Sequence, residues 1–384
     1  MFRKCIVLGG GVLSLSSLYL THSGNEKFYS NILMPTMWKM PAEFSHKLAV
    51  FACKYGIMGQ AEFVDSERLR TDFLDISLSN PVGIAAGFDK DGEAVKGLHE
   101  LGFGFVEIGS ITPLPQPGNP KPRCFRLVED RAIINRFGFN SDGHERVLER
   151  IKKLREDWTF HGVIGVNLGK NKTSPSAEED YAAGIKLFGP VADYLVINIS
   201  SPNTPGLRNL QNKDQLKSLL TSAVEAKKSL KKNVPLLLKI APDLIVEELN
   251  EIAEIIQLEQ CRVDGLIVNN TTVSRPPTLK SEHREEVGGL SGAPLFDLST
   301  KIIFHMYKKT DGKIPIIGVG GISSGRDAFD KILAGASAVQ LYTAFAFYGP
   351  PVVNKIKREL DELLQKNGFK SVAEARGMAH EVTK

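Results

Sequence analysis

Eight short runs of almost uninterrupted apolar residues, separated by helical stretches, constrain the fold of this chain more than any other feature. The runs cover residues 82–86, 105–108, 163–168, 194–199, 236–240, 265–268, 314–319 and 338–341. Continuous rather than alternating apolar strands are typical of parallel sheets that helices cover. Eight such units predict closure into a (β/α)8 TIM barrel of the α/β class.

Two insertions interrupt the alternation. A proline-rich stretch at residues 113–122 leads into CFRLVEDRAIINRFGFN, which we expect to form an extra hairpin, and residues 271–298 are expected to form a long polar loop. The chain has 384 residues, but a barrel of about 250 residues or more folds as one domain. We therefore predict a targeting or transmembrane segment at 1–22, a helical domain at 23–65 and the barrel at 66–384.

The amino terminus differs from the rest of the chain. Arg3 and Lys4 precede a run without charge from Cys5 to Leu20. As a helix this run is about 24 Å long, shorter than the roughly 30 Å of a bilayer's hydrocarbon core. We predict a single N-terminal membrane anchor with a basic flank. A secretory signal peptide is the alternative, although no small-residue cleavage pattern follows.

The segment from residue 28 to 57 is predicted to form two helical pieces that separate near Pro41. Apolar residues of the second piece share one face at helical spacing, namely Phe44, Leu48, Phe51, Ala52 and Tyr55. Two interpretations stay open. The pieces pack on the barrel, or they lie at a bilayer surface and admit a lipid-soluble ligand.

Polar residues follow each predicted strand, where barrel enzymes place their active sites. The fourth strand runs into NISSPNTPGLRNL, residues 198–210, which in isolation is better explained as a surface turn. Polar residues recur at the ends of all eight strands, and this recurrence favours a binding site. The strand ends supply lysines, amides and hydroxyls but no metal-ligand cluster, which suits a planar, carbonyl-rich cofactor and substrate rather than metal-dependent hydrolysis.

Two strand ends carry specific signals. Lys239 lies among Leu236, Leu237, Leu238 and Ile240, and a buried lysine needs an anionic partner. A salt bridge to a neighbouring strand is the structural alternative to a ligand contact. GVGGISSG, in seventh position, predicts a phosphate site with a helix beginning near Ser323 or Ser324.

Charge and cysteine content exclude other classes. The net charge of +4 is too small to indicate nucleic-acid binding. The four cysteines are far apart in the sequence and predict neither a disulfide framework nor a zinc site. The sequence gives no sign of an obligate protein partner.

Several ordered motifs resemble one family. NPVGIAAGFDKDGEA, GFVEIGSITPLPQPGNPKPR, INRFGFNSDG, GVNLGKNK, NISSPNTPGLR, LLKIAPD, NNTTVSRP, GGLSGAPL and PIIGVGGISSG are similar to the membrane-associated class 2 dihydroorotate dehydrogenases, from residue 28 to the C-terminus. The resemblance implies oxidation of (S)-dihydroorotate to orotate in pyrimidine biosynthesis. It also implies an FMN cofactor, ubiquinone as electron acceptor, and location on the lipid of the mitochondrial inner membrane.

The resemblance also implies site residues. Ser201 would be the catalytic base, and Lys239 would stabilise the reduced flavin. The flavin positions would be Ala86, Gly87, Lys90, Ser110, Asn167, Asn198, Lys239, Asn269, Gly292, Gly321, Tyr342 and Thr343. The substrate positions would be Lys90, Asn135, Arg136, Phe137, Gly138, Phe139, Asn198, Asn203, Asn270 and Thr271. The quinone site would include His46, Arg126 and Tyr342.

Two other classes of protein fit the sequence less well. A different flavin barrel calls for a cysteine acid with an RNA-binding surface, or for an active-site histidine, and neither is evident at these strand ends. A membrane-tethered binding protein on a degenerate barrel predicts missing strand-end residues, yet Ser201, Lys239 and Lys90 are present. The chain departs from the family's usual pattern at Asn269 and Trp38.

Overall fold

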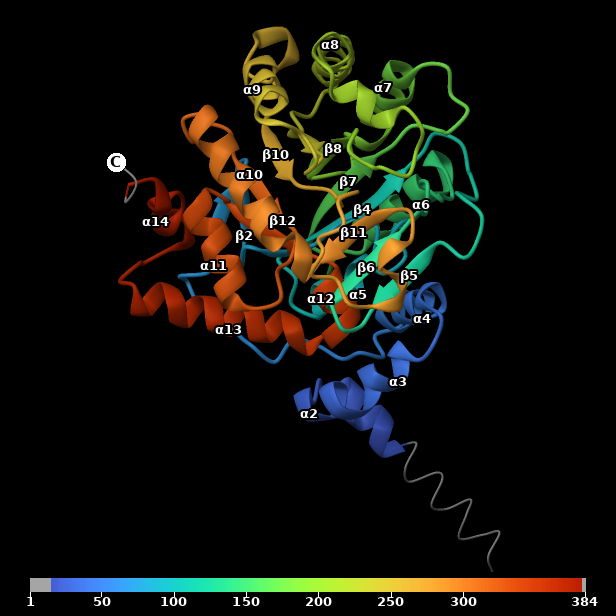
Figure 1. Cartoon of the computed structure of the whole chain (residues 1–384), viewed down its shortest axis with the longest axis vertical. Coiled ribbons are helices and arrows are strands. Elements are labelled where there is room, and N and C mark those ends of the chain that lie inside the picture. Colours follow the sequence, from blue (N-terminus) through green and yellow to red (C-terminus); the bar gives the residue numbers. More distant parts are fainter. Residues whose placement is uncertain (1–14, 382–384) are drawn as a thin grey trace, which may run out of the picture.

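Eight parallel strands close into a barrel in the computed structural model, which describes residues 15–381 (Figure 1). The strands are β3 (Val82–Ile84), β4 (Phe105–Ile111), β7 (Val163–Leu168), β8 (Tyr194–Asn198), β9 (Leu236–Ile240), β10 (Gly265–Val268), β12 (Ile316–Val319) and β13 (Ala338–Leu341). Each pairs with the next in chain order, and β13 pairs with β3 to close the barrel. The predicted TIM barrel is confirmed, with small shifts at the strand ends.

Helices surround the barrel because each presents an apolar face to the strands. They are α5 (Val95–Glu100), α6 (His144–Glu156), α7 (Ala177–Phe188), α8 (Lys213–Lys228), α9 (Val246–Ile255), α10 (Phe296–Lys309), α11 (Gly325–Ala334), α12 (Thr343–Tyr348), α13 (Pro351–Lys366) and α14 (Val372–Ala375). Ser324 caps α11 by accepting a hydrogen bond from the Asp327 N–H. The predicted start of this helix is therefore confirmed.

A hairpin that the sequence analysis missed lies at the amino-terminal end of the barrel. It consists of β1 (Thr71–Phe73) and β2 (Ile76–Leu78). Phe73 and Leu78 are buried in one cluster with Phe105 and Tyr194, which begin two barrel strands. This packing fills the amino-terminal end, and the polar strand ends lie at the opposite, carboxyl end.

A three-stranded antiparallel sheet lies beside the carboxyl ends of the barrel strands. The predicted hairpin is confirmed as β5 (Cys124–Leu127) and β6 (Ala132–Asn135). The prediction of loop throughout 271–298 is wrong, because β11 (Gly289–Gly292) pairs with β6. Its sequence GLSG has low strand propensity, so the strand depends on its partner rather than on its own residues.

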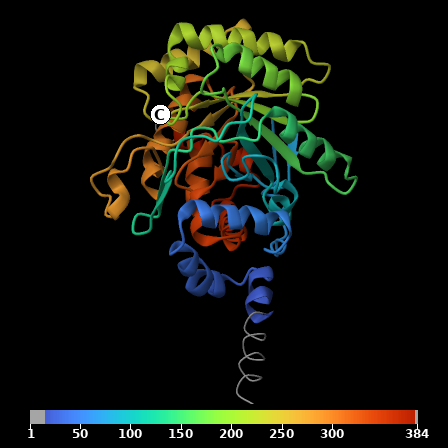
Figure 2. The same ribbon diagram turned by 90° about the vertical axis from the view of Figure 1, so that its right-hand side faces the viewer.

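The amino-terminal helices form a separate layer below the barrel (Figure 2). They are α2 (Glu26–Phe28), a π-helical turn (Tyr29–Leu33), α3 (Met34–Trp38) and α4 (Ala42–Lys54). Pro41 is the N-cap residue of α4, which confirms the predicted break. Helix α4 packs through Ser45 and Cys53, which are buried.

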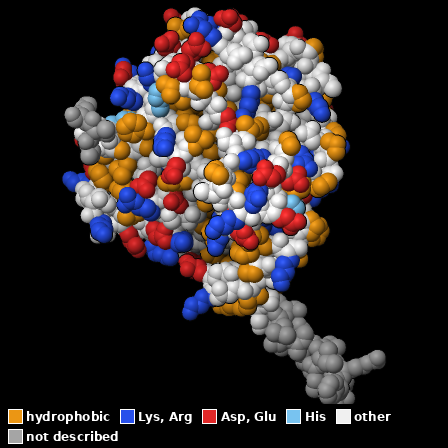
Figure 3. Space-filling view, viewed as in Figure 1, with side chains coloured by type: hydrophobic (Ala, Val, Ile, Leu, Met, Phe, Trp, Pro, Cys, Tyr) orange, Lys and Arg blue, Asp and Glu red, His pale blue; other side chains and the backbone are white. Residues whose placement is uncertain are grey.

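The apolar face predicted on α4 points largely to solvent. Its largest side chains are exposed by 57% (Phe44), 41% (Leu48), 52% (Phe51) and 61% (Tyr55). Hydrophobic side chains are visible at this lower end of the molecule in the space-filling view (Figure 3). The helix thus packs on the barrel through one face and leaves the other, apolar face uncovered.

Across residues 15–381, no helix is long and apolar enough to cross a membrane. Most of the predicted anchor falls in residues 1–14, outside the described residues, while residues 15–22 are helical. The anchor and the domain bounds at 22 and 65 therefore stay predictions.

Candidate active site

A cavity opens where the carboxyl ends of the barrel strands converge. Its lining comes from the ends of β3, β4, β8, β9, β10, β12 and β13, and from the segments around β6 and β11. The predicted residues that line it are Ala86, Gly87, Lys90, Ser110, Asn135, Phe137, Gly138, Phe139, Asn198, Ser201, Asn203, Lys239, Asn269, Asn270, Thr271, Gly292, Gly321, Tyr342 and Thr343. Residues far apart in the sequence are thus brought to one site, as the strand-end pattern predicts.

Two of the residues predicted to bind flavin or substrate do not line this cavity. Asn167 is fully buried behind Ser110 and Asn198, and its side-chain amide accepts a hydrogen bond from each. The Arg136 side chain pairs with Glu286 at 2.6 Å and lies over the Phe125 ring. Asn167 therefore supports residues of the lining, whereas the Arg136 guanidinium is held away from the cavity.

Lys239 has an anionic partner that the sequence analysis missed. Glu107 on β4 is fully buried, and its carboxylate lies 3.6 Å from the Lys239 ammonium nitrogen. Glu107 also accepts hydrogen bonds from Asn167 Nδ2 (2.8 Å), Gln340 Nε2 (2.7 Å) and the Tyr194 hydroxyl (3.2 Å). Lys239 thus forms a salt bridge across the barrel interior, to β4 rather than to a neighbouring strand as the alternative predicted, and it also lines the cavity. A lone carboxylate inside the apolar run FVEIG was the signal available in the sequence.

Hydrogen bonds hold the asparagines of the site in place. Asn198 donates to Ser110 Oγ at 2.7 Å, and its amide oxygen accepts from Ser200 Oγ (3.0 Å) and Asn270 Nδ2 (3.2 Å). Asn203 Nδ2 donates to Asn135 Oδ1 at 3.2 Å. Such a network fixes which way each amide presents its donor and its acceptor.

One buried side chain on the cavity wall has an amide without hydrogen-bond partners among the described residues. Asn269 is 1% exposed, and both atoms of its amide lack a hydrogen-bond partner among the described residues. An unpaired buried polar group costs about 1–3 kcal/mol. Asn269 lies on the lining with Lys239, so a ligand that offers both a donor and an acceptor at this edge would satisfy it.

The loop after β12 has the features of an anion site. In the described part of the chain, no acceptor pairs with the backbone N–H groups of Gly321 and Ile322. Gly321 has φ +78°, and a Cβ there would come within 2.5 Å of Phe296 Cβ. Glycine is therefore required for the loop to lie this close to α10, and the free N–H groups suit a phosphate.

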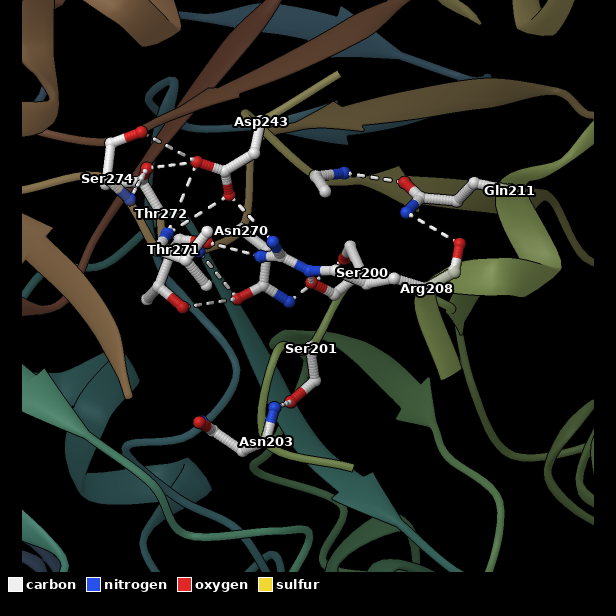
Figure 4. Close-up of polar contacts among 12 residues, drawn as sticks. Ser200, Ser201, Asn203, Arg208, Gln211, Asp243, Asn270, Thr271, Thr272 and Ser274 are labelled. Carbon is white, nitrogen blue, oxygen red and sulfur yellow. Dashed lines mark hydrogen bonds and ion pairs between the residues drawn. The ribbon is translucent and has the colours of Figure 1, made fainter. Parts of the chain in front are cut away.

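Ser201 lies in the loop that follows β8. Its side chain is 7% exposed, and its Oγ accepts a hydrogen bond from the Asn203 N–H at 3.3 Å (Figure 4). Asn203 and Asn270 line the same cavity. The Ser201 hydroxyl is therefore held among the amides predicted to bind substrate.

Lys90 is a cation poised to titrate near neutral pH. Its ammonium donates to the Gly87 carbonyl at 2.6 Å and lies 4.4 Å from the centre of the Phe137 ring. Burial lowers the pKa of Lys90 to about 8. The side chain is thus charged below this pH and can bind a carboxylate.

The family resemblance implies orotate as a ligand of this site, and its affinity is then expected to fall as the pH rises above about 8. The reason is that Lys90 loses its proton there in the protein without ligand and no longer attracts the orotate carboxylate. Well above this pH the affinity should fall tenfold per pH unit. Orotate titrations followed by the flavin spectrum between about pH 6.5 and 9 would measure this. Lys90→Met should bind weakly with no such step. A step of the same size in that variant would contradict the assignment to Lys90.

A second cavity of about 270 Å³ lies between the amino-terminal helices and the barrel. The three predicted quinone-site residues, His46, Arg126 and Tyr342, line it together with mostly apolar side chains. Arg126 donates to the Trp38 carbonyl (3.0 Å) and to Ser45 Oγ (2.7 Å). Tyr342 lines both cavities and therefore separates the two sites.

His46 is neutral in this second cavity. Burial, together with the nearby Lys90 and Lys47 cations, lowers the pKa of His46 to about 3. Its Nδ1 lies 3.4 Å from the Tyr342 hydroxyl. The cavity thus offers a neutral imidazole, a phenol and a guanidinium within otherwise apolar walls, a pattern suited to a molecule with an apolar body and a polar head.

Known proteins match nearly the whole chain. The family model for dihydroorotate dehydrogenase matches residues 68–364. The mitochondrial dihydroorotate dehydrogenase (quinone) of Mus musculus is 52% identical over 382 residues, covering 98% of this chain and 96% of the relative. That of Azorhizobium caulinodans is 48% identical, covering 90% and 98%. The ligand-free DHODH structure from Eimeria tenella superposes with a TM-score of 0.85 at 45% identity, covering 88% and 99%.

Proposed function

The chain belongs to the dihydroorotate dehydrogenase family, and from that premise we propose that it oxidises (S)-dihydroorotate to orotate with FMN and passes the electrons to ubiquinone. The reaction is a step of pyrimidine biosynthesis. One observation carries the proposal. The cavity that brings Ser201, Lys239 and the asparagines together shares Tyr342 with an apolar cavity suited to a quinone.

The lining fits FMN. The Gly321 and Ile322 N–H groups would hold its phosphate, and Lys239 with the unsatisfied Asn269 amide would pair with the polar edge of its ring. When bound, FMN would supply a hydride acceptor that can pass electrons on singly or in pairs. The Lys239 cation would stabilise negative charge at that edge.

The substrate is a small ring that carries a carboxylate and two ring amides. Lys90 would bind the carboxylate, and the amides of Asn135, Asn203 and Asn270 would each offer a donor or an acceptor to the ring. The three asparagine side chains are already hydrogen-bonded, to each other or to Ser200, so little ordering is needed when the substrate binds.

Ser201 would remove the proton from the substrate carbon next to the one that gives up hydride. An unassisted hydroxyl is a weak base, and it needs a hydrogen-bonded route by which the proton leaves. The Asn203 N–H donates to Ser201 Oγ and orients the hydroxyl, which would take up the substrate proton as its own proton passes to water.

We place the protein in the mitochondrion, at the inner membrane. Support comes from the exposed apolar face of α4, since Leu48 and Phe51 on that helix also line the second cavity. An apolar face that lies on a bilayer would open this cavity to lipid, and a ubiquinone would enter from the membrane without crossing water.

Two measurements test the function. Orotate formation should require ubiquinone under anaerobic conditions, and the cofactor released by heat should have the mass of FMN. Release of FAD would contradict the cofactor assignment. Orotate formation without any added acceptor, beyond a single turnover, would contradict the role of the quinone.

Arg126→Leu should separate the two half-reactions. We expect it to slow flavin reoxidation by ubiquinone at least tenfold, because a charge-assisted hydrogen bond in an apolar cavity contributes about 1.5–3 kcal/mol. Flavin reduction by dihydroorotate should be unchanged, because Arg126 does not line the first cavity. Stopped-flow absorbance measures both steps. Equal slowing of the two steps would show that the variant disturbs the fold rather than the quinone site.

A further inference from the structure

The guanidinium of Arg208 joins three loops of the active site. Arg208 lies in a 3-10 helix (Leu207–Gln211) after β8. Its Nε donates to the Ser200 carbonyl at 2.9 Å, and one terminal nitrogen donates to Asp243 at 2.7 Å. The other terminal nitrogen donates to the Thr271 carbonyl at 2.8 Å (Figure 4). These acceptors follow β8, β9 and β10 respectively.

Asp243 extends the connection to the loop after β10. Its carboxylate accepts hydrogen bonds from the Thr272 hydroxyl, from Ser274 Oγ (3.3 Å) and from the Val273 N–H (3.1 Å) (Figure 4). The side chains of Arg208 and Asp243 are 22% and 15% exposed. A partly buried Arg–Asp pair with this many additional bonds has a defined geometry, unlike an exposed surface pair.

Neither Arg208 nor Asp243 lines the cavity. Their charges also neutralise each other, so the pair is not a binding site for the anionic substrate. The two residues whose carbonyls Arg208 binds are next to residues with proposed roles in the reaction. Ser200 precedes the base Ser201, and Thr271 follows the substrate-binding Asn270. Its position thus indicates an effect on geometry rather than contact with the reacting atoms.

We propose that Arg208 and Asp243 are positioning residues that fix the distance between the base and the amides that hold the substrate. The inference rests on the proposed function. Proton abstraction needs the base and the substrate carbon at near-contact distance, and a displacement of about 1 Å costs about 100-fold in rate. The three bonds of Arg208 tie the loop of the base to the loop of the substrate amides, so the two cannot shift independently.

The chain contains a matched control. Arg155 makes the same set of bonds, to two carbonyls (Val191 and Gly162, both 3.0 Å) and to the Asp193 carboxylate. Asp193 immediately precedes β8, so this clamp lies at the opposite end of the barrel. Loss of either arginine removes equivalent bonds, but only loss of Arg208 should alter the active site.

The test compares Arg208→Gly with Arg155→Gly. We expect Arg208→Gly to keep its flavin, but dihydroorotate should reduce that flavin about 100-fold more slowly than in the wild type. Added guanidinium should raise the rate of flavin reduction in this variant about tenfold. Arg155→Gly should be reduced at the normal rate and gain nothing from guanidinium. Arg208→Lys retains the charge but cannot make all three hydrogen bonds, so its rate of flavin reduction should lie between those of the wild type and Arg208→Gly. It serves as a second variant if the glycine variant does not fold.

Hydrogen exchange supplies a readout that needs no substrate. Exchange at 200–204 and at 270–274 should rise together in Arg208→Gly and in Asp243→Asn, but not in Arg155→Gly. Unchanged exchange in these loops, or equal slowing of reduction in both glycine variants, would overturn the positioning role. A wild-type protein whose flavin dihydroorotate does not reduce would overturn the proposed function instead, and the exchange result would still decide whether the clamp exists.

Discussion

Replacement of Ser201 by alanine is expected to slow reduction of the bound flavin by dihydroorotate by about 10²–10⁴-fold, the range that a positioned general base contributes. The hydroxyl is the group in this cavity to which we assign removal of the substrate proton, and alanine cannot accept it. Flavin binding should be unaffected, because Ser201 bonds only to the Asn203 N–H of its own loop among the described residues. Stopped-flow absorbance under anaerobic conditions measures the rate.

The control for this variant is Ser218→Ala. Ser218 lies on α8 outside the barrel, where it donates to Glu178, and its loss should leave the rate unchanged. Orotate affinity should also change little in Ser201→Ala, since the amides and Lys90 remain. Near-normal flavin reduction in Ser201→Ala would remove this residue from the mechanism.

Replacement of Lys239 by methionine is expected to destabilise the fold as well as to abolish activity. The change leaves Glu107 as a buried carboxylate without its cation, and the loss of one partner of a buried pair costs about 3–5 kcal/mol. We expect a value near the lower limit, because three neutral donors still bond to Glu107. Urea unfolding of the flavin-free protein measures this free energy.

The double variant Lys239→Met/Glu107→Gln separates stability from chemistry. It should regain much of the lost stability, since no uncompensated charge remains in the barrel. It should not regain flavin reduction, because the cation that stabilises the reduced flavin is still absent. If Lys239→Met unfolds like the wild type, the ion pair is not structurally important. If the double variant is reduced normally, Lys239 has no electrostatic role.

The barrel could be predicted because its signals are local in the sequence. Each strand is a separate apolar run, and the polar residue that follows it marks the carboxyl end. The break at Pro41 and the cap at Ser324 also depend on single residues with fixed conformational preferences. Such local patterns can be interpreted without knowing which distant segments contact each other in the fold.

The missed features depend on contacts between distant segments. Strand β11 exists because Leu290 pairs with Ile134, 156 positions earlier. Glu107 sits in an apolar run, and only the closed barrel places it beside Lys239. The direction of the Arg136 side chain likewise follows from Glu286. Periodicity identifies each strand but not the cross-strand partners of its polar residues.

The proposed function requires one protein to join two half-reactions through adjacent cavities. The most direct test adds dihydroorotate to the anaerobic, purified protein, follows the visible flavin absorbance, and then adds a short-chain ubiquinone. We expect the absorbance to bleach on the first addition and to recover on the second. A flavin that stays oxidised with dihydroorotate, or that bleaches but does not recover with quinone, would contradict the claim.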